Sequence, residues 1–190
     1  MRARVVLAVL AFLVIPTTQG EAQQRAAPPA TDVTAAEIEA VYNTIGSSID
    51  QQIKIADIGD GNVAVGVLHR DAVQDQGDAP TGLVHTEVSE VYYVLSGGGT
   101  LVTGGTTTVL GNLPADNRAV TELIGPSYRA TSEGGYSRQI SEGDVVVIPA
   151  GLFHAWSEIP DHVTYLSIRV DPDRTLPAGY LHPVLESNED

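Results

Sequence analysis

Between residues 34 and 46, apolar residues recur three and four positions apart, which places them on one face of an α-helix. Thr34 and Glu37 match the Thr-x-x-Glu capping box that begins many helices, and Gly46 is suited to end one. The sequence therefore predicts one amphipathic helix at about 34–46. Its apolar face comprises Ile38, Val41, Tyr42 and Ile45.

From residue 53 the pattern changes to short apolar and β-branched runs separated by Gly and Pro. Such runs are typical of strands, and Asp60-Gly61 is a turn signal between two of them. Many short strands with frequent turns indicate a sandwich or barrel, so we predict an all-β fold with one short helix. The strands are expected at 53–58, 63–69, 90–95, 100–103, 106–110, 144–148 and 163–170.

Residues 111–137 interrupt this pattern with Pro114, Gly125-Pro126 and Gly134-Gly135. Long segments without regular structure are uncommon in compact domains and are often functional. We therefore expect 111–137 to be an inserted loop that covers or flanks the mouth of a cavity.

The N-terminus resembles a secretory signal peptide. A basic start at Met1–Arg4 precedes the apolar run Val5–Ile15, which is short for a membrane span, and small residues follow at Gly20-Glu21-Ala22. We predict a signal peptide at 1–22 and an exported protein, either periplasmic or secreted. A membrane anchor or a buried helix is the alternative.

The predicted organisation has five parts. They are a signal peptide at 1–22, a linker at 23–33, an N-terminal helical extension at 34–52, a β-barrel at 53–170 and a C-terminal tail at 171–190.

Charge narrows the choice of partners. Acidic residues outnumber basic ones, 24 to 10, and the formal net charge is −14. Such a surface repels phosphate backbones and anionic lipids, so we expect neither nucleic-acid nor membrane binding. The chain has no cysteine, which excludes disulfides, thiolate metal sites and cysteine nucleophiles. A small-molecule substrate remains as the expected partner, and a homodimer is compatible with the sequence.

Two spaced motifs carry the candidate chemistry. The first runs through Gly77, His85, Glu90 and Gly97, with Leu83 two residues before the histidine. The second contains Gly143, Pro149, Gly151 and His154, and ends at Glu158.

These motifs resemble the two motifs of the cupin family in its single-domain, cupin-2-like form. The spacing matches throughout, and eight of ten marked positions match. The first motif has Leu83 in place of its first histidine, and the second has Glu158 in place of its asparagine. The resemblance covers about 53–170 and implies a double-stranded β-helix, the jelly-roll barrel.

The resemblance also implies a metal site. His85, Glu90 and His154 would converge on one divalent transition metal inside the barrel, with Fe, Mn, Ni, Co or Zn as candidates. Three protein ligands leave coordination positions for water or substrate.

Strand parity tests this arrangement. His85 and Glu90 are an odd number of residues apart, so on one regular strand they would point to opposite faces. Both face inward only if the chain bends between 86 and 89. Tyr92 shares its parity with Glu90 and should line the same cavity. Tyr92 and Glu87 are the candidates for proton transfer, although a core tyrosine and a solvated carboxylate are the alternative interpretations.

Leu83 leaves three hypotheses open. The site works with three ligands, another group replaces the missing imidazole, or the site has lost its metal. His69 is the candidate replacement, because it shares its parity with Val63, Val65 and Val67, which we interpret as an inward face.

Three further residues are candidates to contact a substrate or to line the cavity. Arg169 and Arg138 are candidates to hold a substrate carboxylate, although a surface arginine is the favoured interpretation of each. Trp156 shares its parity with His154 and should line the cavity.

Two function classes follow. The first is a metal-dependent enzyme acting on a small organic substrate, and two histidines with one carboxylate favour dioxygenase-like chemistry. The cupin resemblance equally admits an isomerase or a lyase. The second class is a non-catalytic binding protein, which Leu83 favours and the retained ligand-type residues disfavour.

Overall fold

The computed structural model describes residues 30–186, so the predicted signal peptide and most of the predicted linker lie outside the described residues. Within 30–186, no helix is long and apolar enough to cross a membrane. The elements, in chain order, are α1 (Ala35–Tyr42), β1 (Asp50–Asp57), β2 (Asn62–Val73), β3 (Thr81–His85), β4 (Ser89–Thr103), β5 (Thr106–Asn112), a turn of π-helix η1 (Ala119–Ile124), β6 (Ser127–Glu133), β7 (Tyr136–Ser141), β8 (Val145–Ile148), β9 (His154–Asp171) and α2 (Pro183–Glu186).

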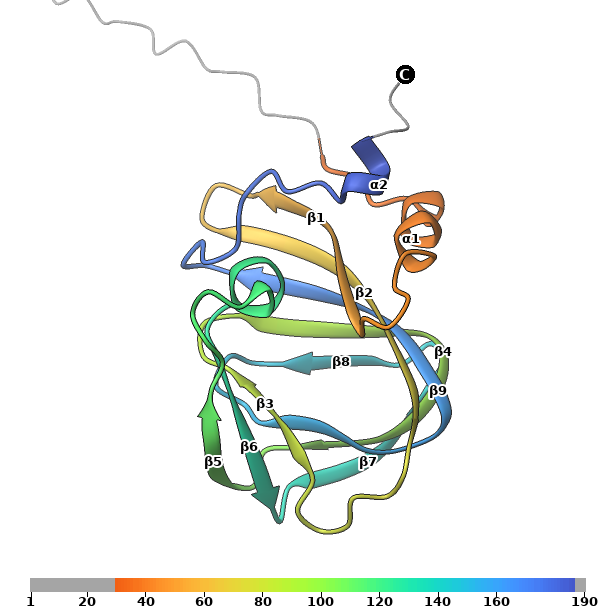
Figure 1. The fold of residues 1–190 in the computed structure, drawn as a ribbon, viewed down its shortest axis with the longest axis vertical. Helices are drawn as coiled ribbons and strands as arrows, with labels where there is room; N and C mark the ends of the chain where they lie inside the picture. The colour runs from red at the N-terminus through yellow and green to blue at the C-terminus, as the bar shows by residue number, and fades with distance from the viewer. Residues whose placement is uncertain (1–29, 187–190) are drawn as a thin grey trace, which may run out of the picture. The chain divides into compact units, whose positions relative to one another are not determined.

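Two antiparallel layers share the two longest strands, β4 and β9 (Figure 1). One layer has the order β1-β2-β9-β4-β8 and uses the first half of β4 and the second half of β9. The other has the order β5-β6-β3-β9-β4-β7 and uses the remaining halves. This arrangement is a jelly-roll double-stranded β-helix, so the predicted fold class is confirmed.

Helix α1 begins as predicted and ends earlier. The Thr34 hydroxyl accepts a hydrogen bond from the Glu37 N–H, and the Glu37 carboxylate accepts one from the Thr34 N–H. The capping box is therefore confirmed. The helix ends at Tyr42 rather than near Gly46, because the chain turns after Asn43, and Gly46 takes the left-handed φ of 55°.

An apolar cluster lies between α1 and the outer face of the β1–β2 pair. It comprises Val41, Ile45, Ile53, Val67 and Leu185. Leu185 belongs to α2, and Leu181 pairs with Lys54 of β1 through a backbone bridge. The described part of the predicted C-terminal tail is thus packed against β1.

The predicted inward face of β2 is wrong. Val65 and Val67 pack in the cluster under α1, whereas Leu68 lies in the core between the layers. Alternation shows which residues share a face but not which face is inside, and here a helix provides a second apolar environment. Arg70 shares its parity with Leu68 and faces the barrel, while His69 lies on the α1 side.

Two segments differ from the predicted strands. β9 is one strand from His154 to Asp171 and is longer than the strand expected at 163–170, because its ladder with β2 passes Pro160-Asp161 through a register shift instead of ending there. Residues 111–137 were expected to be an inserted loop, but they contain η1 and β6. The Gly and Pro residues of this segment mark turns between short elements rather than an unstructured loop.

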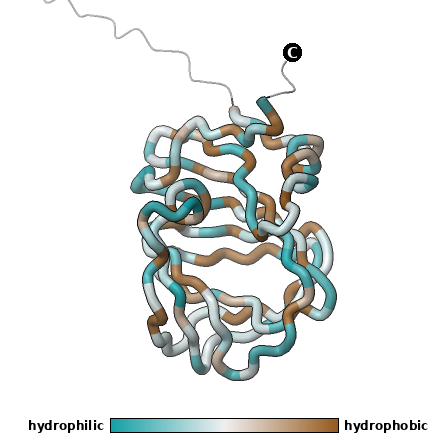
Figure 2. Tube along the Cα trace, in the orientation of Figure 1, coloured by the Kyte–Doolittle hydropathy of each residue, from teal (hydrophilic) through white to brown (hydrophobic). Residues whose placement is uncertain are grey.

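An apolar core lies between the layers. Figure 2 shows the hydrophobic positions recurring along the strands that border it. Its buried members are Leu68, Tyr92, Val94, Leu101, Ile140, Val146, Ile148, Trp156, Ile159, Val163 and Tyr165.

Candidate metal centre

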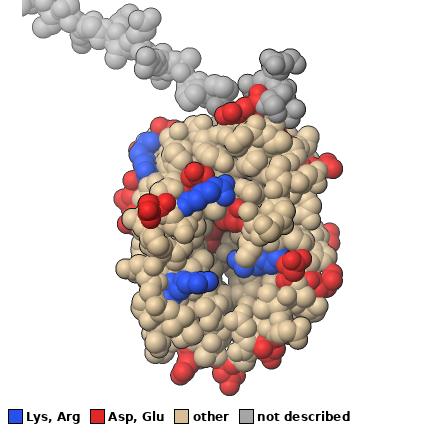
Figure 3. Space-filling model, in the orientation of Figure 1, with Lys and Arg blue, Asp and Glu red and all other residues tan. Residues whose placement is uncertain are grey.

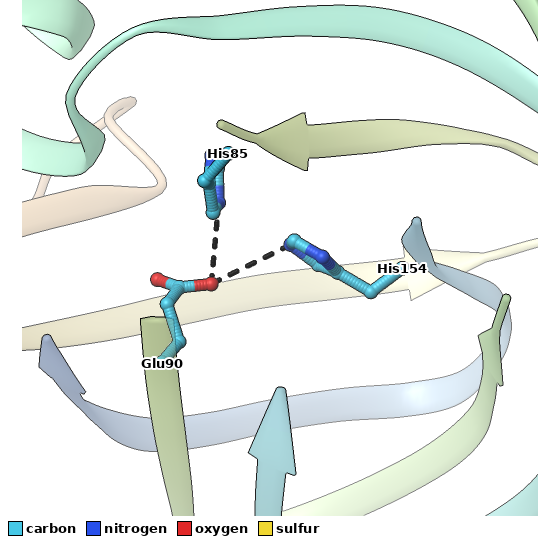
Figure 4. A group of neighbouring side chains, drawn as sticks. All are labelled: His85, Glu90 and His154. Carbon is cyan, nitrogen blue, oxygen red and sulfur yellow. Dashed lines mark ion pairs between the residues drawn. The ribbon is translucent and has the colours of Figure 1, made fainter. Parts of the chain in front are cut away.

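Three ligand-type side chains converge inside the barrel (Figure 4). His85 ends β3, Glu90 is the second residue of β4, and His154 begins β9. Glu90 Oε2 lies 3.2 Å from His85 Nε2 and 3.4 Å from His154 Nε2. One ligand atom from each residue lies within 4.8 Å of the other two, and all three residues are buried.

The bend predicted between 86 and 89 is present and brings two of these residues together. β3 ends at His85, the chain bends through Thr86 and Glu87, and β4 begins at Ser89. The bend reverses the parity of the chain, so that His85 and Glu90 both face inward.

Hydrogen bonds to the far ring nitrogens set the tautomer of each imidazole. Ser127 Oγ donates to the Gly125 carbonyl, so it accepts from His85 Nδ1–H at 2.8 Å. His154 Nδ1 lies 3.1 Å from the Leu152 carbonyl, which only accepts. Both rings therefore carry a proton on Nδ1, which leaves Nε2 as the nitrogen that faces Glu90 and is available to a metal, as in metal-binding histidines.

Glu90 is held from behind by a buried polar network. Its Oε1 accepts hydrogen bonds from Ser167 Oγ at 2.7 Å and Arg169 Nε at 3.2 Å. The remaining guanidinium nitrogens of Arg169 donate to Gln52 and Asp50, each at 2.5 Å. Glu90 and Arg169 are direct cross-strand neighbours on β4 and β9. The network leaves Oε2 as the oxygen that faces the two imidazoles.

Arg169 corrects one expectation from the sequence. A surface arginine was favoured there, but its side chain is fully buried. Its guanidinium is occupied by Asp50, Gln52 and Glu90, so it is not free to hold a substrate carboxylate.

The surroundings shift the pKa of Glu90, of His154 and of Tyr92. Burial raises the pKa of Glu90, but His85, Arg169 and His154 outweigh burial and hold that pKa well below its usual value. Burial and the nearby His85 lower the pKa of His154 to about 4. Burial, and then the Glu90 charge, raise the pKa of Tyr92 well above its usual value. At neutral pH Glu90 is thus ionised, while His154 and Tyr92 are neutral.

These residues fit a divalent transition metal. Two imidazole nitrogens and one carboxylate oxygen are typical ligand atoms for such ions, and the other polar atom of each ligand is already hydrogen-bonded. Three ligands leave room for further ones. Within residues 30–186, this is the one group of three or more His, Asp or Glu residues close enough to hold an ion.

The cluster opens into a cavity of about 660 Å³. Tyr92 and Trp156 line it as the sequence predicted, and the Tyr92 hydroxyl donates to Glu90 Oε2 at 2.9 Å. Eight residues of the 111–137 segment also line it, including Leu123 and Ile124 of η1 and Arg129 of β6. In the space-filling view a hollow on this face is flanked by basic side chains (Figure 3).

Leu83 faces the same cavity. It is the direct cross-strand neighbour of His154, on the strand that ends at His85. The position that would supply a fourth ligand in the motif is therefore an apolar part of the wall beside the cluster.

The structure does not bring three sequence candidates, His69, Glu87 and Arg138, to the cluster. His69 Nδ1 lies 2.8 Å from Thr164 Oγ1, and its ring contacts Tyr42 of α1 edge-on at 5.7 Å. Glu87 lies on the bend after β3 and is not among the described residues that line the cavity. Arg138 likewise lies outside the cavity lining, on β7.

The sequence reading missed Asp50, Gln52 and Arg70. One signal was available in Gly66, because a glycine inside a strand often marks a close approach of another group. A Cβ at Gly66 would lie 2.7 Å from Arg169 Nη1 and 3.3 Å from Asp50 Oδ1. Gly66 therefore marks where the buried guanidinium crosses β2.

The fold agrees with a comparison of families. The chain belongs to the cupin family, since the family model described as Cupin matches residues 62–181, more than half of the 190 residues.

Several solved structures are similar at low sequence identity. DMSP lyase DddQ from Ruegeria pomeroyi shares 17% identity with a TM-score of 0.41, covering 81% of this chain and 72% of that one. A cupin 2 conserved barrel domain protein from Rhodopseudomonas palustris shares 16% with a TM-score of 0.35, covering 70% and 64%. A conserved protein with a double-stranded β-helix domain from Klebsiella pneumoniae shares 14% with a TM-score of 0.37, covering 65% and 79%. Likenesses of this size carry no argument about activity, and no curated protein matches the chain.

Proposed function

We propose that this cupin is a metal-dependent enzyme that acts on a small organic substrate. The observation that carries the proposal is the convergence of His85, Glu90 and His154 at the inner end of a cavity large enough for a substrate. A divalent metal bound there would act as a Lewis acid and as a template for substrate.

The chain's own residues supply the rest of the proposed chemistry. Glu90 is fixed by Ser167 and Arg169, so the carboxylate needs little reorganisation when a metal binds. Tyr92 is the proposed proton donor, because its hydroxyl lies on the cavity wall 2.9 Å from Glu90 Oε2. A dioxygenase-like reaction is favoured by the two-histidine, one-carboxylate set.

Metal content tests this proposal most directly. Elemental analysis of the purified protein is expected to show one transition metal per chain. The variant His154→Ala should lose it, because one of three ligands is gone, while the matched control His69→Ala should retain it. Full metal retention in His154→Ala would show that the ligand assignment is wrong.

A substrate-independent probe addresses the reaction class. With Fe(II) bound, nitric oxide should give the electron paramagnetic resonance signal of an iron site with an open coordination position. A metal-loaded protein that gives no such signal would argue against dioxygenase-like chemistry and favour an isomerase or a lyase.

Leu83 supports a second candidate, a non-catalytic binding protein. An apolar residue stands where the motif has a histidine, and it lies against other apolar groups in the cavity wall. A protein purified without metal that also rejects added Fe(II), Mn(II), Ni(II), Co(II) and Zn(II) would favour this candidate.

Export belongs to the same proposal and rests on the sequence of residues 1–22. Mass spectrometry of protein from the envelope or medium of the source cell should show a chain that begins after about Ala22. A chain that retains Met1 in the cytoplasmic fraction would contradict it.

A further inference from the structure

Arg70 brings an unpaired positive charge to the cavity wall. It lies on the face of β2 that points into the barrel, two residues beyond Leu68, and it is half-buried. Its Nε donates to the Tyr165 hydroxyl at 3.1 Å. No carboxylate among residues 30–186 forms an ion pair with it, so both terminal nitrogens of the guanidinium are available to a ligand.

Of the other basic side chains among residues 30–186, Arg129 and Arg138 also form no ion pair, and the remaining four are paired. Lys54, Arg118, Arg169 and Arg174 each form an ion pair with a carboxylate. Among the three arginines without an ion pair, Arg70 is the one that both lines the cavity and contacts the fully buried Tyr165.

Trp156 provides a second unpaired donor on the same wall. Its indole Nε1 is buried and has no hydrogen-bond partner, and the side chain is 6% exposed. Leaving a buried N–H without an acceptor is costly, so such groups usually have a ligand or water as partner. The Trp156 ring lies 5.7 Å from the ring of Tyr165, whose hydroxyl contacts Arg70. Arg70 and Trp156 therefore both contact Tyr165, one at its hydroxyl and the other at its ring.

The charged residues in and behind the cavity wall also favour an anionic ligand. Arg70 and Arg129 are among the residues that line the cavity, and Arg169 is bonded to Glu90 of the cavity wall. They outnumber the two carboxylates of the wall, Asp50 and Glu90, so the region is positive even before a metal binds. The remaining wall is largely apolar, with Leu68, Val73, Leu83, Leu113, Leu123 and Ile124.

We infer that the cavity binds a small organic acid with an apolar body, whose carboxylate accepts hydrogen bonds from Arg70 and from Trp156 Nε1. A carboxylate has two acceptor oxygens and no donor, which matches two unpaired donors, and its geometry suits a guanidinium fork. That this acid is the substrate rests on the proposed function, whereas its binding to Arg70 and Trp156 does not depend on a metal.

Matched acid and amide pairs test the inference. The probes are acetate and acetamide, hexanoate and hexanamide, and 3-phenylpropanoate and 3-phenylpropanamide. Binding is measured by calorimetry on protein treated with EDTA. Trp156 is the single tryptophan of the chain, so its fluorescence reports binding at the cavity. We expect at least one acid to bind about tenfold or more tightly than its amide, as for a charged hydrogen bond.

Variants test whether Arg70 causes the tighter binding of acids than of amides. Arg70→Gln should bring the affinities for acid and amide close together, and Arg70→Lys should restore part of the difference. Arg138→Gln is the matched control and should bind like the wild type, because Arg138 lies outside the cavity. Trp156→Phe, followed by calorimetry, should weaken acid and amide alike, because either can accept from the indole N–H.

The outcomes separate this inference from the proposed function. An acid preference in EDTA-treated protein that is lost in Arg70→Gln supports the inference, even if the protein binds no metal. An acid that binds only Zn(II)-loaded protein, with unchanged affinity in Arg70→Gln, overturns the inference while the metal site stands. Binding of none of the acids, or equal affinity for acids and amides in the wild type, also overturns it.

Discussion

The two faces of the β1–β2 pair bury different kinds of side chain. Toward α1, the contacts are apolar, and Ile53 and Val67 pack against the helix. Toward the barrel, Asp50 and Gln52 hold the fully buried Arg169, which in turn holds Glu90. Only the barrel face has charged groups in its interior, because the ion pair on the α1 side, Glu37–Lys54, lies at the partly exposed rim.

The apolar face of the β1–β2 pair contributes mainly to stability, whereas the charged face serves the candidate metal site. Apolar contacts are non-directional, so the face under α1 tolerates small changes in packing. A buried charged network depends on every partner, and it rarely stabilises a protein more than a well-packed apolar core does. The network around Arg169 is therefore best explained by what it does, which is to fix the position of the Glu90 carboxylate.

The largest expected effect comes from removing the cation of the charged face. Arg169→Met should destabilise the protein by about 3–5 kcal/mol, because Asp50 and Glu90 would be left buried without their partner. Denaturant unfolding of EDTA-treated protein measures this without a contribution from bound metal. Metal affinity should also fall, because Glu90 loses a hydrogen-bond donor.

The matched control for Arg169→Met is Arg138→Met, at a site with no ion pair among residues 30–186. We expect a change within about 0.5 kcal/mol for this control. Equal stability of the two variants would mean that the buried network is not important for the fold.

Leu83→His tests the same face by adding a ligand instead of removing one. The new imidazole would lie beside His154 on a preorganised site, so metal affinity should rise about tenfold or more, or roughly 1.4 kcal/mol. Any native activity should fall, because the imidazole occupies space that water or substrate uses. Leu83→Met, which keeps an apolar side chain, is the control. Competition with a fluorescent chelator measures the affinity, and an unchanged value would show that position 83 does not reach the ion.

The fold and the ligand cluster could be predicted because they depend on local spacing. The two motifs specify which residues start and end short strands, and the opposite parity of His85 and Glu90 required the bend that the structure contains. Thr34 and Glu37 determined the start of α1 through contacts three residues apart. Each of these features is set within a few residues.

The charged face could not be predicted in the same way, because its contacts join residues more than 70 positions apart. Arg169 meets Asp50 and Glu90 from the opposite end of the chain. Parity grouped Val65 with Val67 correctly, but which face α1 covers depends on tertiary packing, so Arg70 was overlooked. Gly66 was the one local sign of the buried guanidinium.

Ile53→Val makes a small change on the apolar face. Removing one buried methylene should cost about 0.5–1.5 kcal/mol. Metal stoichiometry and affinity should be unchanged, because Ile53 packs toward α1 and not toward the cluster. Denaturant unfolding and chelator competition on the same preparation measure both quantities. A loss of metal affinity in this variant would show that the two faces of the β1–β2 pair are energetically coupled.

The smallest expected effect concerns the exposed rim of the apolar face, where Glu37 of α1 contacts Lys54 of β1. Glu37 Oε1 accepts from Lys54 Nζ at 2.6 Å, and Glu37 Oε2 accepts from the Thr34 N–H at 2.8 Å. The Lys54 contact, and then the Thr34 N–H, lower the pKa of Glu37 below its usual value of 4.5. Because the folded-state pKa is depressed, the stabilisation is present above the unfolded-state pKa and is lost as pH falls through the folded-state pKa.

Glu37→Gln should therefore be less stable than the wild type near pH 7 by up to about 1 kcal/mol, and the difference should shrink in acid. The amide oxygen of glutamine still accepts from Thr34 N–H, so the substitution isolates the charge. Glu39→Gln, on the exposed side of the same helix, should show no such difference at either pH. Denaturant unfolding at neutral and acidic pH, with and without added salt, measures the effect, which screening should reduce. If the difference between Glu37→Gln and the wild type stays constant as the pH falls, the ion pair with Lys54 is not its source.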